Sequence, residues 1–400
     1  MRTGDQTLIK ELNKNIIMNL IRNQSPISRA QISVESGLNK ATVSSIVDEF
    51  IQEGLVIELG PARSAIGRRP RMLGFNATAG YAIGVELGIE YVHVLTVDLA
   101  GRVVSSHESP LPTTDVRSVV AEIVACIKEE ISNIPDSDLG IIGVGLGVPG
   151  LVDFSSGNVL YSPNLGWSDV PLRAYLEAHI NLPIFIDNEA NTGALAEQLF
   201  GVGTADENAV YFSVGTGIGV GIILNHGLIR GSGGTAGEFG HMIVEARGLR
   251  CSCGSRGCLE MYASTRALVS KYAQLAGTTV SFDEIMRRLR DGENNAVQAV
   301  NSIGHYLGTG ISNVINGLNP SLVVIGNRLS EAGECLLNSV KDVIHSSALD
   351  VPASLARVEL SSLGRNATAT GAASLALNDY FQGPFPYAHT EPSRVGGRQG

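Results

Sequence analysis

Three of the five cysteines in this chain of 400 residues lie close together, at Cys251, Cys253 and Cys258. Two cysteines one residue apart do not easily bridge each other, and the third would be left without a partner. The cluster is therefore either a set of reactive thiols or a set of ligands for one metal ion. Zinc at a structural site takes four ligands in a tetrahedron, and thiolates are among those it prefers. Gly254 and Gly257 let the loop fold back on itself, so that the three sulfurs can converge on one ion. We therefore predict structural Zn2+ rather than a redox centre.

The composition indicates a soluble, cytoplasmic protein without membrane association. Hydrophobic residues make up 44% of the chain, which is enough to form buried cores. The start, from Met1 to Asp5, is polar and lacks the apolar run of a secretory signal. The longest apolar stretch, residues 209–224, contains four glycines and is too short to cross a bilayer as a helix. In a reducing compartment clustered cysteines are more often metal ligands or catalysts than disulfides.

The first 75 residues have the pattern of three short helices. Apolar residues recur at helical spacing from Leu8 onwards and predict a first helix that ends near Asn23. Ser28-Arg29-Ala30-Gln31 has the form of a capping box at the start of a second helix. Gly37 supplies the left-handed residue that ends this helix, and Asn39 can cap a third. Two short helices joined by a glycine-containing turn predict a helix-turn-helix at about residues 28–47.

A hairpin follows the third helix and completes a winged helix-turn-helix. One strand is expected at Leu55–Glu58 and a return strand near Leu73, with an arginine pair, Arg68 and Arg69, at the base of the loop between them. This head carries a formal net charge of +3, whereas the rest of the chain carries −13, so only the head is suited to a polyanion. A protein–protein module with a basic loop is the alternative. Operator DNA is the expected partner, and the residues expected to contact it are Asn39, Lys40, Ala41, Thr42, Ser44, Ser45, Arg68 and Arg69.

From Tyr81 onwards the pattern changes to short strands that occur in two similar series. Tyr81–Leu87 and Val92–Asp98 begin the first series, and Val210–Val214 and Gly219–Leu224 begin the second. Helical segments follow each series, including residues 116–131 and 296–318. The sequence therefore predicts an α/β body of two lobes with a cleft between them, like the duplicated actin and sugar-kinase (ribonuclease H-like) fold. The expected domains are residues 1–76, 77–193 and 194–379, followed by a disordered tail at 380–400.

The chain resembles the ROK family of bacterial sugar kinases and sugar-responsive repressors from about residue 8 to 378. The most specific match is Gly237-Glu238-Phe239-Gly240-His241 followed by the cysteine segment up to Glu260. Within the family, the head looks most like that of the xylose repressors. The resemblance implies that His241 is the fourth zinc ligand, with Cys251, Cys253 and Cys258. It also implies that a sugar binds at Asn188, Glu189, Glu238, His241 and Glu260, with Asn164 a weaker candidate.

The resemblance also sets out what a kinase member would need. The phosphate loop of the kinases, Asp-x-Gly-Gly-Thr, is replaced by Glu86-Leu87-Gly88-Ile89-Glu90, in which Ile89 adds a side chain and Glu90 a negative charge. A second glycine loop, Gly215-Thr216-Gly217-Ile218-Gly219, is retained, which is weak evidence alone. Glu189 stands where the kinases have an aspartate, and Asn327 follows Gly326 where a glycine pair is expected.

The sequence therefore predicts a transcriptional repressor and not an enzyme. We expect a homodimer or higher homo-oligomer that binds a palindromic operator and is released by a free sugar, with D-xylose as the expected inducer. The alternative is a bifunctional regulator that still phosphorylates a hexose. A third class is a sugar-binding scaffold whose head contacts proteins.

Overall fold

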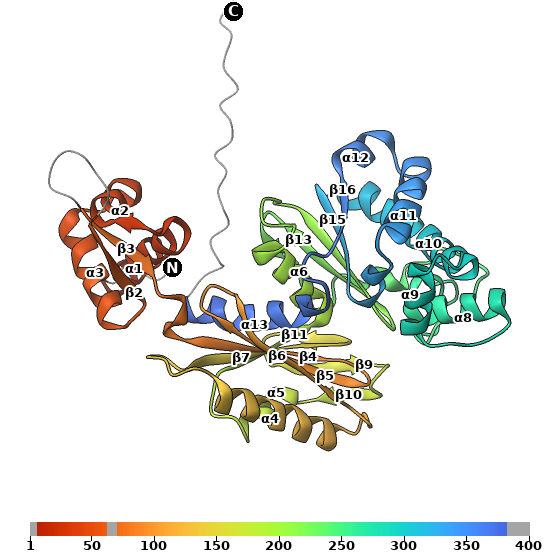
Figure 1. Cartoon of the computed structure of the whole chain (residues 1–400), viewed down its shortest axis with the longest axis horizontal. Helices are drawn as coiled ribbons and strands as arrows, with labels where there is room; N and C mark the ends of the chain where they lie inside the picture. The colour runs from red at the N-terminus through yellow and green to blue at the C-terminus, as the bar shows by residue number, and fades with distance from the viewer. Residues whose placement is uncertain (1–5, 62–69, 382–400) are drawn as a thin grey trace, which may run out of the picture.

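The computed structural model describes residues 6–61 and 70–381, arranged as a small head and a two-lobed body (Figure 1). The helices are α1 (Gln6–Gln24), α2 (Arg29–Ser36), α3 (Lys40–Gln52), α4 (Val116–Asn133), α5 (Leu172–Glu177), α6 (Glu189–Phe200), α7 (Glu260–Ala263), α8 (Thr265–Ala276), α9 (Phe282–Arg290), α10 (Asn294–Leu318), α11 (Gly333–Ser347), α12 (Asp350–Leu355) and α13 (Ala367–Tyr380). The strands are β1 (Ile27–Ser28), β2 (Val56–Pro61), β3 (Arg71–Phe75), β4 (Tyr81–Leu87), β5 (Tyr91–Asp98), β6 (Val103–Pro110), β7 (Ile141–Val148), β8 (Leu151–Asp153), β9 (Asn158–Ser162), β10 (Trp167–Val170), β11 (Ile184–Asn188), β12 (Ala209–Val214), β13 (Ile218–Leu224), β14 (Gly227–Leu228), β15 (Leu322–Gly326) and β16 (Arg357–Leu360).

The head has the winged helix-turn-helix architecture that the sequence predicts. Helices α1, α2 and α3 pack beside a small sheet of order β1-β3-β2, in which β2 and β3 form the wing strands. The capping box is present, because Gln31 N donates to Ser28 Oγ at 3.3 Å and Ser28 N donates to Gln31 Oε1 at 3.0 Å. Gly37 ends α2 with a φ of 70°, and the side chain of Asn39 caps α3. Arg68 and Arg69, in the wing loop, lie outside the described residues.

The body contains two five-stranded sheets with the same connectivity. The orders β11-β7-β4-β5-β6 and β16-β15-β12-β13-β14 match strand for strand. In each sheet the first three strands in sequence run antiparallel and the last two are added in parallel. This duplication confirms the predicted fold class. A third, small sheet, β10-β9-β8, is attached to the first lobe.

Helix α13 packs on the first sheet although it follows the second sheet in sequence. Figure 1 shows it lying along that sheet on the face opposite α4 and α5. The packing is close: a Cβ at Gly84 or at Gly145 would collide with a backbone carbonyl of α13, at Ala369 or Ala372 respectively. The chain therefore returns to the first lobe at its end, which a division into consecutive domains does not anticipate. Of the predicted tail at 380–400, Tyr380 ends α13, Phe381 is buried, and the rest lies outside the described residues.

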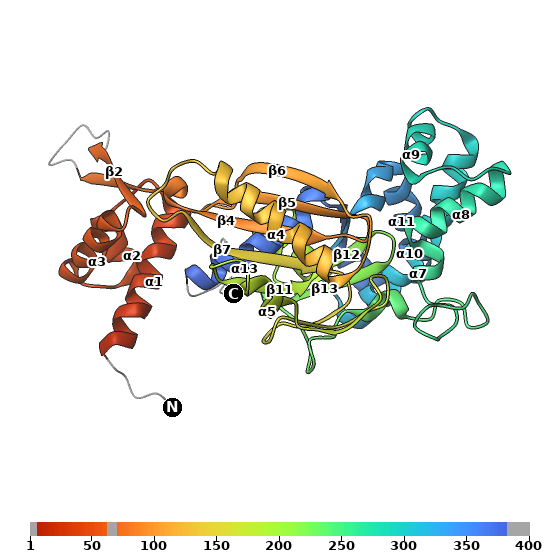
Figure 2. The same ribbon diagram turned by 90° about the horizontal axis from the view of Figure 1, so that it is seen from below.

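The head is joined to this part of the body through a shared hydrophobic core. Apolar residues of α1, α3 and β3 form one buried cluster with residues of β4, β5 and α13. At its edge the rings of Phe75 and Phe381 lie 6.1 Å apart, and the guanidinium of Arg22 lies 4.0 Å from the centre of the Phe381 ring. The head is therefore packed against the body and is not joined to it by a linker alone. Figure 2 shows the N-terminal half of α1 projecting beyond this joint.

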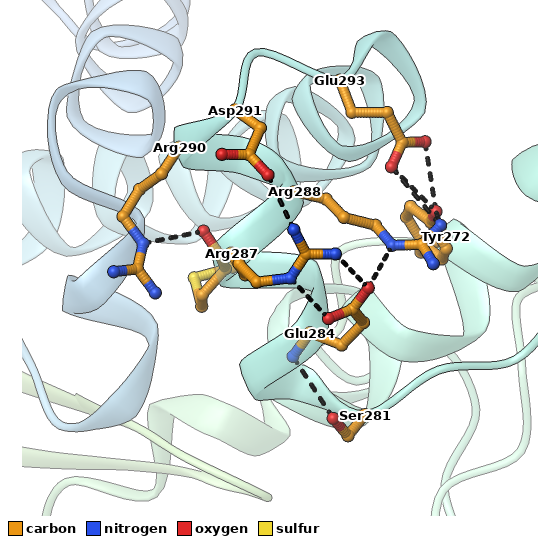
Figure 3. Close-up of polar contacts among 9 residues, drawn as sticks. Tyr272, Ser281, Glu284, Arg287, Arg288, Arg290, Asp291 and Glu293 are labelled. Atoms are coloured by element: carbon orange, nitrogen blue, oxygen red, sulfur yellow. Dashed lines mark hydrogen bonds and ion pairs between the residues drawn. The ribbon is translucent and has the colours of Figure 1, made fainter.

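The far end of the second lobe is held by an arginine–carboxylate network on α9 (Figure 3). Arg287 and Arg288 both donate to Glu284, at 2.7–2.8 Å. Arg288 also donates to the hydroxyl of the fully buried Tyr272 at 2.6 Å, and this hydroxyl donates to Glu293. The network connects α8, α9 and the start of α10.

Within residues 6–61 and 70–381, none of the helices has the length and apolar character needed to cross a membrane.

Candidate functional site

A cavity of about 780 Å³ lies between the two lobes. The first lobe contributes residues from β4–β5, the β7–β8 turn, the β9–β10 turn and the end of β11, and the second lobe contributes the glycine loop, η2 (Glu238–His241), α7 and α8. All five side chains predicted to bind sugar line this cavity: Asn188, Glu189, Glu238, His241 and Glu260. Asn164, the weaker candidate, lines it as well. The structure thus brings together residues that are up to 96 positions apart in the sequence.

Glu260 is fixed against the glycine loop. Its carboxylate accepts a hydrogen bond from Ile218 N at 3.1 Å and is largely buried. A Cβ at Gly217 would lie 2.6 Å from Glu260 Oε2, so the close approach of this carboxylate requires a residue without a side chain. The retained glycine loop therefore has a role that involves no phosphate: it holds Glu260 at the cavity wall.

Glu189 lies among other carboxylates. Burial raises its pKa to about 8, and the charges of Glu86, Glu260 and Glu238 act in the same direction. At neutral pH Glu189 is therefore mainly protonated and can donate as well as accept a hydrogen bond. A set of carboxyl groups that includes protonated and ionised members suits a ligand whose hydroxyl groups both donate and accept hydrogen bonds.

Asn188 has a structural role beside its place in the cavity wall. Its Oδ1 accepts from Ala190 N at 2.8 Å and from Asn191 N at 3.3 Å, so the side chain caps α6. Its Nδ2 donates to Gly150 O at 2.8 Å. The amide still has one N–H that these contacts do not use. Asn188 is therefore both a helix cap and a rigid part of the wall.

The predicted metal ligands converge beside the cavity. The ligand atoms of His241, Cys251, Cys253 and Cys258 all lie within 4.8 Å of one another. Two of the separations, Cys251 Sγ to His241 Nδ1 and Cys253 Sγ to Cys258 Sγ, are 3.6 Å. Tetrahedral zinc at about 2.3 Å from sulfur and about 2.0 Å from nitrogen holds its ligands roughly 3.5–3.8 Å apart. The cluster therefore fits the size and donor set of a structural zinc site.

His241 connects this cluster to the cavity. Its Nδ1 faces Cys251, whereas its Nε2 lies 3.8 Å from Glu238 Oε2. A ligand on Nδ1 fixes the ring and leaves Nε2–H as a donor toward the cavity and the Glu238 carboxylate. The histidine–cysteine cluster and the cavity wall thus share one side chain.

Tyr91 packs against Gly88, the first residue of the segment Gly88–Glu90 that the sequence resemblance aligns with the kinase phosphate loop. The Tyr91 hydroxyl donates to Glu86 at 2.8 Å, and its ring packs so closely on Gly88 that a Cβ there would lie 2.6 Å from Tyr91 Cδ1. Burial, followed by the charge of Glu86, raises the pKa of the Tyr91 hydroxyl. The Tyr91 side chain is thus held between Glu86 and Gly88, at the start of this segment.

In the head, the predicted DNA contacts lie on the first turns of α3. Asn39, Lys40, Ala41 and Ser45 are exposed, whereas Thr42 and Ser44 are partly buried. The Asn39 side chain accepts from Thr42 N at 2.9 Å. Asn39 therefore positions the start of the helix, and the exposed surface is formed mainly by the residues around it.

The sequence motifs did not indicate two arginines that connect the lobes. Arg266, on α8, donates to Asn164 Oδ1 of the first lobe at 3.2 Å and to Thr216 O at 3.1 Å. Arg230, after β14, forms an ion pair with Asp187 at the end of β11. Neither lies in a motif that predicts a contact between lobes. Their sequence signal is limited to nearness to predicted cavity residues: Arg266 follows Glu260 by six positions, and Arg230 precedes Glu238 by eight.

The comparisons with known proteins agree on one family. The model of the ROK family matches residues 82–379. A xylose repressor of Bacillus subtilis (strain 168) is 37% identical over 380 residues, covering 95% of this chain and 98% of the relative. An N-acetylglucosamine repressor of Escherichia coli O157:H7 is 31% identical over 355 residues, covering 86% of this chain and 87% of the relative.

Two solved structures extend the comparison to the fold. A ROK family transcriptional regulator described as a homolog of the E. coli MLC protein superposes with a TM-score of 0.81 at 30% identity, covering 94% of this chain and 98% of that one. A ROK family glucokinase from Streptomyces griseus, in complex with glucose and AMPPNP, gives a TM-score of 0.70 at 31% identity, covering 74% of this chain and 99% of that one. The regulator thus matches head and body together, and this chain belongs to the ROK family.

Proposed function

We propose that this protein is a sugar-responsive transcriptional repressor that binds a palindromic operator as a homodimer and is released by a free sugar, D-xylose. One observation carries the proposal: the same chain contains a winged helix-turn-helix head that shares a buried core with the body, and a cavity of about 780 Å³ between the two lobes of that body, lined in part by carboxyl groups. Similarity to xylose repressors over 95% of the chain supports both the class and the sugar.

The chemistry of the cavity supports a polyhydroxylated ligand. Carboxyl groups of Glu189, Glu238 and Glu260, together with the Nε2 side of His241, face one space. Each carboxylate oxygen can accept from a sugar hydroxyl, and the protonated Glu189 can donate to one. These groups would also accept a hexose, so the choice of D-xylose rests on the similarity to named relatives.

Structural zinc is part of the proposal. Held by His241, Cys251, Cys253 and Cys258, it would close the loop that precedes α7 and orient the His241 ring. Metal analysis of the purified protein should give about one zinc per chain. Cys258→Ser should lose the metal and weaken sugar binding, because Glu260 follows this loop directly. A metal-free protein that binds sugar normally would contradict this part.

We further propose that the protein does not transfer phosphate. Tyr91 packs on Gly88 in the segment aligned with the phosphate loop, and Glu90 adds negative charge where a nucleotide would need the opposite. The competing function, a regulator that is also a hexose kinase, is favoured by the similarity to a glucokinase. Incubation with ATP and D-glucose or D-xylose decides between them. Turnover at roughly 1–100 s⁻¹, the range of kinases, would establish the competing function.

The experiment that tests the repressor function is selection of genomic DNA fragments by the purified protein, with and without pentoses. We expect one palindromic sequence class to be enriched and D-xylose to remove it. Enrichment of no sequence would favour a scaffold whose head contacts proteins.

A further inference from the structure

Arg230 extends from the second lobe to a buried carboxylate of the first. Its Nε and Nη2 both donate to Asp187 Oδ2, at 2.8 and 2.7 Å. Its guanidinium also lies 4.0 Å from the centre of the Phe154 ring, in the turn between β8 and β9. An arginine between an aromatic face and a carboxylate combines a charge-assisted hydrogen bond with stacking. This contact is therefore directional rather than a loose surface ion pair.

Asp187 connects the contact with Arg230 to the wall of the cavity that the first lobe forms. Its side chain is almost fully buried, with 2% exposed. The other oxygen, Oδ1, accepts from Asn188 N at 2.8 Å and from Asn191 Nδ2 at 2.9 Å. Asn188 and Glu189, which face the cavity, follow directly in sequence. The carboxylate thus orients the backbone on which this wall is built.

Arg230 also belongs to a strap that leads to the second wall. The strap, residues 229–237, runs from the end of β14 to η2 and carries Thr235 into the cavity before reaching Glu238. It turns back on itself where Ala236 N donates to Arg230 O at 3.0 Å. At Gly234, whose φ is 74°, the strap lies so close to the first lobe that a Cβ would be 2.5 Å from Val152 O. A second-lobe segment is thus seated on the first lobe.

From these contacts we infer that Arg230 is a positioning residue for the sugar site: by binding Asp187 and stacking on Phe154, it sets the separation and orientation of the two cavity walls. This inference rests on the proposed sugar-binding function and adds a residue that contacts no sugar. A sugar held between two walls loses affinity when one wall shifts by a fraction of an ångström, because hydrogen bonds weaken steeply away from their preferred geometry. The walls can be held in register only by a contact that spans both lobes, and Arg230 makes one.

The test compares Arg230→Lys with a matched control, Arg173→Lys. Arg173 donates to the backbone carbonyls of Phe154 and Ser155, at 3.0 and 2.8 Å, but lies within the first lobe. Calorimetric titration with D-xylose should show at least a tenfold loss of affinity for Arg230→Lys and less than a twofold change for Arg173→Lys. Operator affinity without sugar should change less than twofold in both. Hydrogen exchange should be faster in the strap of Arg230→Lys, at Ala236 in particular.

A double-mutant cycle separates positioning from a general loss of stability. Asp187→Asn removes the acceptor charge, and the double variant Asp187→Asn/Arg230→Lys should bind D-xylose no worse than the weaker single variant, because both changes break the same contact. Phe154→Leu keeps the ion pair but removes the stacking and should give an intermediate loss. This variant provides the test if Arg230→Lys does not fold.

The outcomes are distinguishable from failure of the proposed function. If the wild-type protein binds none of D-xylose, D-glucose and N-acetylglucosamine, both the function and the inference are wrong. If the wild-type protein binds sugar and Arg230→Lys binds it equally well, only the inference is wrong. Additive losses in the double variant would also overturn it, since they would show that Arg230 and Asp187 act separately.

Discussion

At the scale of single residues, the positions of the side chains that line the cavity depend on residues outside it that hold them in place. The histidine–cysteine cluster and the carboxyl groups of the cavity could be predicted from sequence because cysteine spacing and a family motif mark them. Arg230 and Arg266 could not, because an isolated arginine, in a loop or on a helix, carries no signal for the surface it will meet. The family resemblance implies a sugar contact for Asn188, and the structure shows that its side chain also caps α6.

Gly217 should be replaceable only at the expense of sugar binding. In Gly217→Ala the new methyl group would lie 2.6 Å from Glu260 Oε2, so this carboxylate must move from the amide of Ile218. We expect D-xylose affinity to fall roughly 10- to 150-fold, corresponding to loss of one charged hydrogen bond, roughly 1.5–3 kcal/mol. Gly215→Ala, where the nearest atom is Asn327 Nδ2 at 3.3 Å, is the control. Equal affinities for both variants would contradict the role assigned to the glycine loop.

Glu189 should make stability depend on pH. Its pKa is about 8 in the folded protein and near 4.5 in an unfolded chain, so between these values the folded state holds a proton that the unfolded state releases. Stability should therefore fall as pH rises from about 4.5 to 8. Glu189→Gln removes this term, and its advantage over wild type above pH 8 should be on the order of 2 kcal/mol, less than the full shift because cavity water screens the charge. Denaturant unfolding at pH 5 and 8.5 measures it, and parallel pH profiles would contradict it.

At the scale of elements, local signals predicted the head well. The capping box, the left-handed Gly37 and the Asn39 cap are chemical choices made within a few residues, and the structure confirms each. The strands that begin the two series, β4, β5, β12 and β13, were also predicted to within one residue, because buried strands carry apolar runs, whereas no bounds were predicted for β7, β11, β15 and β16. The packing of α13 on the first sheet could not be predicted. It depends on glycines at positions 84 and 145, which contact a helix more than 200 residues later in the sequence. A local sequence pattern does not indicate contacts between segments so far apart.

Helices α8 and α9 should depend on the hydroxyl of Tyr272. Tyr272→Phe keeps the buried ring but leaves Arg288 and Glu293 without the oxygen they share. The unfolding free energy should fall by about 0.5–1.5 kcal/mol, as for a typical hydrogen bond. Arg290→Lys, in which the side-chain contact is to Met286 O, should have a smaller effect. A Tyr272→Phe protein as stable as wild type would show that the network in Figure 3 adds nothing measurable.

At the scale of the whole molecule, the head is attached where it can respond to the cleft. Helix α6 begins at the cavity wall and packs against α13 so closely that a Cβ at Gly371 would collide with Thr192 O. Helix α13 ends beside Phe381, which contacts Arg22 and Phe75 of the head. The duplicated body could be predicted from repeated strand patterns, but this joint could not, because it is formed by residues at both ends of the chain.

Phe381→Ala should uncouple the sugar signal from DNA binding. The variant loses the ring that contacts the head, so D-xylose should bind with unchanged affinity while its effect on operator affinity shrinks toward none. Leu355→Ala, an exposed apolar residue on α12, is the control and should keep the full response. Both affinities are measured by titration with labelled operator. A full sugar response in Phe381→Ala would rule out this joint as the connection.

The measurement that tests the central claim most directly is calorimetry of D-xylose binding, with and without operator DNA. If sugar releases the repressor, thermodynamic reciprocity requires DNA to weaken sugar binding by the same factor. We predict that saturating operator lowers D-xylose affinity roughly 5–150-fold, the range of typical allosteric coupling. Equal affinities and heats with and without operator would contradict a sugar-released repressor, even if D-xylose binds well.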